Sequence, residues 1–375
     1  MKKLIWTLVI LVVVGVFGGR AWWLYQHRDN NQKDTLNIGI VTFRGAFAKM
    51  GQDVDNGIIL ANEQFSKSHP DIKIKLHFED GKGVAKDAVS AFNKLMMHDI
   101  DALIVTGDNM VPVVAPLIAQ HKLPAILTIV GSDDFVKHNS PRYMHKNNFS
   151  IGKSAGQFAD WVVKNNNIKT ISVLAQHTVY ALEGVKAFSD AAKENGVSVL
   201  KEEKFRETDT DVRPVVEKVL ADNPDAIFVC GYGKAYINIL NRLKESHYKG
   251  LILVDKGMLN PETLDGLKEK SGFVFFDVLA PQDKIKAFNE VFEKRFKEVP
   301  SSYAQDGYAS MAMLLEGISK SDKTPEGINN ELKKITTIDT VRGRMDIDSN
   351  GVSSLPIFIG KLKADGTYDV LYVKE

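Results

Sequence analysis

The 375-residue sequence has a single cysteine, Cys230, which lies in the apolar run 226–230. One cysteine excludes an intrachain disulfide, and a thiol in an apolar run is typical of a small buried side chain. The nine histidines are scattered without metal-ligand spacing, so no metal site and no cofactor is expected. The net charge is only +1, and without a basic stripe or an RNA-binding signature the chain is not expected to bind nucleic acid.

Signatures of catalysis are also missing. The sequence contains no Gly-x-Gly-x-x-Gly after a predicted strand, no Walker loop, no Gly-x-Ser-x-Gly and no His-Glu-x-x-His. Gly231 and Gly233 supply only two glycines after a strand, which is too little for a dinucleotide site. No nucleophile–base set or carboxylate pair stands out, so we predict no catalytic residues and a protein that is not an enzyme.

The amino terminus carries the pattern of an export segment. Two lysines precede the apolar run 4–19, so the positive end is expected to stay in the cytoplasm. Residues 19–21 fit a cleavage site of small residues, but cleavage there exposes Trp22 and Trp23, which suit a membrane–water interface. We therefore expect residues 1–34 to be an uncleaved transmembrane helix and tether that holds an extracytoplasmic protein at the inner membrane of the periplasm.

Two apolar runs, 102–106 and 124–130, have the length of strands buried on both faces of a parallel sheet, and a helix is predicted between them. Polar or small residues follow each run: Asp108, Asn109, Gly131 and Ser132. Ligands bind at the carboxyl ends of strands in open α/β sheets, so these residues are expected to crowd one rim of a cleft. The alternative is that the Asn and Asp residues only cap helices.

Strands and helices alternate along most of the chain, which predicts an α/β fold with parallel sheets, right-handed crossovers and helices on both faces. The remaining predicted strands are 36–43, 72–78, 170–175, 197–205, 226–230, 251–254, 273–276, 356–362 and 368–373. The predicted helices are 51–66, 84–97, 111–120, 151–165, 182–195, 212–221, 235–246, 284–296 and 305–319.

Several short motifs occur in a familiar order: the segment 45–51, Asn56-Gly57, Glu79-Asp80-Gly81, Leu123-Pro124, Gly231-Tyr232, and Tyr303 with Asp306. Over residues 36–373 the chain resembles the leucine/isoleucine/valine-binding protein family, type I periplasmic binding proteins that feed ABC transporters. The resemblance implies two lobes, 35–149 plus 278–343 and 150–277 plus 344–375. They would be joined by three crossover hinge strands near Phe149, Asp277 and Gly343.

The resemblance also implies the ligand-binding residues: Asn109, Val130, Ser132, Tyr180, Tyr232, Asp255 and Lys256. The position at which the family places a carboxylate against a ligand ammonium falls on Lys256. Either Asp255 supplies the carboxylate after a shift of one residue, or the ligand is anionic or lacks the ammonium. A third alternative is that Lys256 points outward from the rim.

The expected function is an extracytoplasmic receptor that captures a small polar ligand (an amino acid, an amide or a small organic acid) and presents it to the membrane permease of an ABC transporter. One alternative is a membrane-tethered sensor subunit without transport. A less favoured one is an α/β enzyme whose site the sequence does not announce.

Overall fold

The structure is a computed structural model of the chain, and it describes residues 35–44, 48–138 and 142–374. The chain divides into two units, Met1–Thr35 and Leu36–Glu375, and every element named below lies in the second. The predicted transmembrane segment and tether, 1–34, lie outside the described residues. Among the helices that are described, none is long and apolar enough to cross a membrane.

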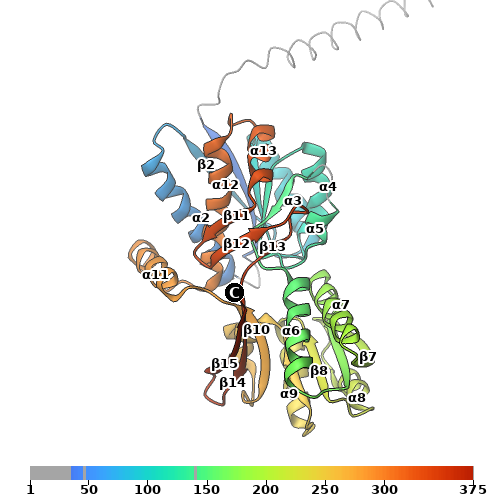
Figure 1. Ribbon diagram of the computed structural model, residues 1–375. Coiled ribbons are helices and arrows are strands. Elements are labelled where there is room, and N and C mark those ends of the chain that lie inside the picture. Colours follow the sequence, from blue (N-terminus) through green and yellow to red (C-terminus); the bar gives the residue numbers. More distant parts are fainter. Residues whose placement is uncertain (1–34, 45–47, 139–141, 375) are drawn as a thin grey trace, which may run out of the picture. The chain divides into compact units, whose positions relative to one another are not determined.

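The first lobe is built on a five-stranded parallel sheet (Figure 1). In spatial order its strands are β2 (Ile74–Asp80), β1 (Leu36–Thr42), β3 (Ala102–Thr106), β4 (Ala125–Thr128) and β5 (Met144–Lys146). The run predicted to be buried on both faces is β3, which is central and fully buried. The alternating run predicted as an outer strand is β2, which lies at the edge.

Helices cover both faces of this sheet because apolar side chains of its strands point both ways. Ile104 packs in one cluster with residues of α2 (Ala48–Ser68) and α12 (Ser302–Lys320). Leu103 packs on the opposite face with residues of α3 (Ala85–Leu95) and α4 (Val111–His121). A short helix, α5 (Asp134–Lys137), follows β4.

The second lobe contains a seven-stranded mixed sheet. In spatial order its strands are β15 (Tyr368–Lys374), β14 (Ile357–Leu362), β10 (Phe273–Val278), β9 (Leu251–Val254), β8 (Ala226–Cys230), β6 (Thr170–Gln176) and β7 (Ser198–Phe205). Strands β6 to β10 run parallel, while the carboxyl-terminal strands β14 and β15 add antiparallel to β10.

Two helix layers flank the second sheet. Phe228 of β8 packs on the face covered by α6 (Ile151–Asn165) and α7 (Val179–Glu194), and its ring stacks 4.1 Å from that of Phe188. Ile227 points to the other face, which α8 (Arg213–Leu220) and α9 (Gly233–Glu245) cover. The helices and strands predicted for this lobe are therefore confirmed within a few residues. Two short helices after β9, η2 (Lys256–Leu259) and α10 (Pro261–Gly266), were not predicted.

The chain between β10 and β14 holds further elements that the sequence pattern did not reveal. After the predicted helices α11 (Gln282–Phe296) and α12 come α13 (Pro325–Lys334) and a small antiparallel sheet. That sheet contains β11 (Thr337–Thr340), β12 (Gly343–Ile347) and β13 (Ser353–Ser354). Its strands are short and partly polar, which leaves little periodic signal. Helix α13 had a local signal, because the Thr324 side chain caps it and a proline occupies its first turn.

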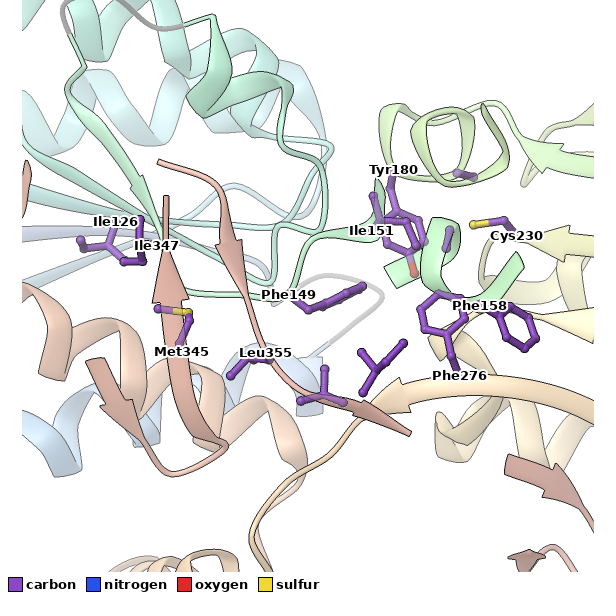
Figure 2. Packing of buried hydrophobic residues seen from close by; sticks show 14 of the residues in the cluster. Ile126, Phe149, Ile151, Phe158, Tyr180, Cys230, Phe276, Met345, Ile347 and Leu355 are labelled. Carbon is purple, nitrogen blue, oxygen red and sulfur yellow. The ribbon is translucent and has the colours of Figure 1, made fainter. Parts of the chain in front are cut away.

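The cores of the two lobes meet at the first crossing. One cluster of buried apolar side chains includes Ile126 of β4, Phe149, and Ile151 and Phe158 of α6, with Phe149 between the two sides (Figure 2). The third passage between sheets follows β13 at residues 355–356, further along the chain than Gly343. The division of residues between the lobes remains a proposal.

Candidate functional site

Two loops of the first lobe come together where β3 and β4 end. The last residues of these strands, Thr106 and Thr128, are paired in register, so the loops leave the sheet side by side. The Asp108 carboxylate accepts hydrogen bonds from the backbone N–H groups of Gly131 (3.2 Å) and Ser132 (3.1 Å). The predicted closeness of Asp108 to Gly131 and Ser132 is therefore confirmed.

The turn out of β4 is strained. Ile129 has a φ of 55°, in the left-handed region that β-branched residues rarely adopt. Such conformations cost free energy and persist only where the surrounding structure holds them in place. The turn carries the predicted ligand residues Val130 and Ser132, both of which are fully buried.

The Ser132 hydroxyl is bonded to the second lobe rather than left free. It donates to Oε2 of Glu183 on α7 over 2.6 Å, and the Asp133 N–H donates to the same oxygen over 3.0 Å. Burial raises the pKa of Glu183. Sequence reasoning missed Glu183, because nothing local to a glutamate in a helix predicts a partner 51 positions away.

A buried ion pair lies directly behind this loop. The Lys146 ammonium, at the end of β5, donates to Asp133 and to the backbone carbonyls of Gly131 and Phe149. The other oxygen of Asp133 accepts a hydrogen bond from the hydroxyl of Ser150, which caps α6. Burial lowers the pKa of Lys146, and Asp133 acts in the opposite direction. This network joins the loop after β4 to the first crossing.

In the second lobe, Asp255 follows β9 and is fully buried. Its carboxylate accepts hydrogen bonds from the hydroxyls of Tyr180 (2.8 Å) and Tyr236 (3.0 Å), and the Cys230 thiol donates to it over 3.6 Å. Burial raises the pKa of Asp255 to about 6, against the effect of these donors. Since protein groups surround it, Asp255 is not placed to meet a ligand ammonium directly.

Lys256 does not point outward from the rim. Its side chain is only 19% exposed, and its ammonium lies 5.4 Å from the ring centre of Phe149 and 4.0 Å from Oδ1 of Asp277. Burial lowers the pKa of Lys256, and the neighbouring Arg342 guanidinium lowers it further. Arg342 is itself buried and paired with Asp306 at 2.9 Å. The Lys256 ammonium therefore has a carboxylate of opposite charge, that of Asp277, beside it without any ligand.

Two of the predicted residues, Asn109 of the first lobe and Tyr232 of the second, contact each other, and both side chains keep solvent-accessible surface. The Tyr232 hydroxyl donates to Oδ1 of Asn109 over 3.4 Å, Asn109 is exposed, and Tyr232 is half-buried. The Tyr232 backbone N–H donates to the Gln176 side chain at the end of β6. The ring centres of Tyr180 and Tyr232 are 6.4 Å apart, so the two tyrosines form one aromatic wall.

The structure thus groups the seven predicted residues into two kinds. Asn109, Tyr232 and Lys256 keep some accessible surface near the meeting of the lobes. Four are buried behind them: Val130, Ser132, Tyr180 and Asp255. In the described part of the chain, no group of three histidine, cysteine or acidic side chains is placed to hold a metal ion.

Comparison with known proteins gives consistent results. The Leu/Ile/Val-binding protein homolog 3 of Brucella melitensis biotype 1 is 23% identical over 332 residues, 86% of this chain and 90% of that protein. The crystal structure of the leucine-binding protein LivK from Thermotoga maritima matches with a TM-score of 0.79 at 21% identity, and covers 91% of this chain and 99% of its own. LivJ from Streptococcus pneumoniae in complex with isoleucine matches with a TM-score of 0.76 at 20% identity, over 91% and 99%.

These structural matches confirm the two-lobe α/β fold that the sequence resemblance implied. The family model described as periplasmic binding protein matches residues 35–367, nearly all of the described chain. The chain therefore belongs to the periplasmic binding protein family.

Proposed function

We propose that this protein is a solute receptor that captures a small polar ligand between its lobes and presents it to the permease of an ABC transporter. The observation that carries the proposal is the meeting of strand-end loops from both sheets, with Asn109 of one lobe bonded to Tyr232 of the other. Loops at the carboxyl ends of parallel strands are the usual ligand sites of open α/β sheets. Ligand binding to the closed arrangement would then favour closure, which a membrane partner can recognise.

The proposed ligand surface consists of Asn109, Tyr232 and Lys256, supported by the buried residues behind them. Ser132 and Asp255 act through the residues they hold, since their polar atoms are bonded to Glu183 and to Tyr180. Val130 offers backbone atoms, because its side chain is buried. The ligand candidates are amino acids, amides and small organic acids.

The family implies an extracytoplasmic location. We further propose that the amino-terminal segment stays attached as a membrane tether, because Trp22 and Trp23 suit an interface better than a soluble terminus. Intact-mass analysis of the protein extracted from membranes tests this. A mature chain that begins at Trp22 and is recovered in the soluble fraction would contradict the tether.

The receptor role is tested by thermal unfolding of the full chain in mild detergent with a panel of amino acids, amides and organic acids. A ligand present at about 100 times its Kd adds roughly 2.7 kcal/mol to the free energy of unfolding. We expect at least one solute to raise the melting temperature in a saturable way and to be recovered unchanged. A panel without any such solute contradicts the binding role, and turnover of the solute would indicate an enzyme.

A further inference from the structure

We propose that Asp108 sets the ligand class of the cleft: the ligand presents a nitrogen hydrogen-bond donor, an amide or an ammonium group, to the loop after β4, and not a carboxylate. This inference rests on the proposed solute-binding function. The sequence resemblance implies instead that the loops after β3 and β4 together hold both a carboxylate and an ammonium group of the ligand.

The first support is that the donors of the loop are already used. The N–H groups of Gly131 and Ser132 donate to Asp108, whereas the Ser132 hydroxyl and the Asp133 N–H donate to Glu183. A ligand carboxylate placed here would find these donors occupied and two protein carboxylates beside it. A ligand carboxylate within hydrogen-bonding distance of this loop would be repelled strongly by both protein carboxylates when water is excluded.

The second support is that Asp108 keeps acceptor capacity. A carboxylate has about four lone-pair sites, and each Asp108 oxygen accepts one backbone N–H in the structure. Asp108 is half-buried. Burial raises the pKa of the Tyr180 and Tyr232 phenols, and the charge of Asp108 adds to the rise in both. A nitrogen donor between Asp108 and Tyr232 would meet an acceptor on the first lobe.

The third support concerns the lysines near the site, since each already has acidic partners. Lys146 spends its three donors on Asp133 and two backbone carbonyls, and Asp277 lies 4.0 Å from the Lys256 ammonium. Lys137, at the rim, lies 3.7 Å from Asp133 and 3.8 Å from Glu183. No lysine among these three is left to require an anion from the ligand.

The experiment compares three probes that differ only in the polar group: benzamide, benzylamine and benzoate. Their Kd values for the full chain are measured by calorimetry, with thermal unfolding as a second readout. We expect the wild type to bind benzamide or benzylamine at least tenfold more tightly than benzoate. Tighter binding of benzamide indicates an amide site, and tighter binding of benzylamine indicates an ammonium site.

Asp108→Ala frees the N–H groups of Gly131 and Ser132, so it should raise the affinity for benzoate. The ratio of the Kd for benzoate to the Kd for the tighter nitrogen probe should fall by at least tenfold. Asp108→Asn keeps the shape but removes the charge, so it should shift the ratio in the same direction by a smaller factor. Asp134→Ala is the matched control, because this aspartate is exposed in the same loop region, whereas the N–H groups of Gly131 and Ser132 donate to Asp108. It should leave the ratio unchanged.

Two results would overturn the proposal: a wild type that binds benzoate as tightly as the nitrogen probes, or folded Asp108 variants that gain no affinity for benzoate. The second result applies even where the wild type binds none of the three probes. A panel solute that binds the wild type while Asp108→Ala gains nothing overturns only the role of Asp108. A panel without any ligand overturns the receptor function itself.

Discussion

The phenol of Tyr180 donates a hydrogen bond of 2.8 Å to Oδ2 of Asp255, a residue 75 positions further along the chain. The bond joins α7 to the loop after β9, and it is completely buried. Tyr236 donates to the other carboxylate oxygen from α9, so one carboxylate is the common partner of two helices on opposite faces of the sheet.

Tyr180→Phe should lower the free energy of unfolding by about 1–3 kcal/mol, because it removes a donor from a buried carboxylate and leaves that acceptor short of a partner. Urea unfolding measures the change. Tyr248→Phe is the control: its hydroxyl donates to the neutral carbonyl of Pro224, and it is only part-buried. We expect a smaller loss for it, near 1 kcal/mol. Equal losses would argue against a special role for the Asp255 bond.

The stability of the protein should depend on pH through Asp255, whose pKa is raised from 3.8 to about 6 by burial. The folded chain then holds more protons than the unfolded chain between these values, so the contribution to stability is present below pH 4 and is lost as pH rises through 6. Relative to Asp255→Asn, the wild type should gain on the order of 2–3 kcal/mol as pH falls from 7 to 4.

The subtraction in this experiment removes the contribution of Asp108, whose pKa is also raised to about 6 and which both proteins share. Unfolding curves at pH 4, 5, 6 and 7 give the difference directly. A difference that stays constant over this range would show that Asp255 has an ordinary pKa in the folded protein.

Lys146→Met should be strongly destabilising, by about 3–5 kcal/mol, because it removes the buried cation that pairs with the Asp133 carboxylate. Lys137→Met provides a matched control. Lys137 approaches the same carboxylate, at 3.7 Å, but its side chain is 42% exposed, so the loss should stay below about 1 kcal/mol. Similar losses for the two variants would mean that the interior pair contributes no more than the surface one.

Asn109→Ala and Ser132→Ala should behave differently once a ligand is known. Asn109 is exposed on its loop, so its replacement should weaken binding by about 1–3 kcal/mol while the unfolding curve stays unchanged. Ser132→Ala breaks the bond to Glu183 and should lower the stability as well. Calorimetry and urea unfolding on the same samples separate the effects. Unchanged affinity in Asn109→Ala would remove this residue from the ligand surface.

The strands and the meeting of the loops that follow them could be predicted because their signals are local. Apolar runs such as 102–106 announce buried strands, and parallel strands bring their following loops to one edge. The polar pairs could not be predicted in this way. Glu183 and Ser132 are 51 positions apart, and the three-residue strand β5 gives no hint that Lys146 is buried. Lysine is rarely buried, so composition points away from such a pair.

The resemblance placed Asp255 and Lys256 at the cleft but left open which one faces the ligand, because a shift of one residue exchanges their roles. The structure shows partners for both: tyrosine hydroxyls for Asp255 and the Asp277 carboxylate for Lys256. These partners come from distant elements, and an alignment of single positions does not contain them.

The reactivity of the Cys230 thiol reports how often the second lobe opens. Cys230 has the only thiol in the sequence, it is completely buried at the end of β8, and burial raises its pKa. Thiolate chemistry requires access and deprotonation, so a thiol-specific dye reaches this sulfur only when the surrounding sheet opens. The rate at which the wild-type protein reacts with the dye therefore measures how often its second lobe opens. A ligand that holds the lobes closed will lower this rate.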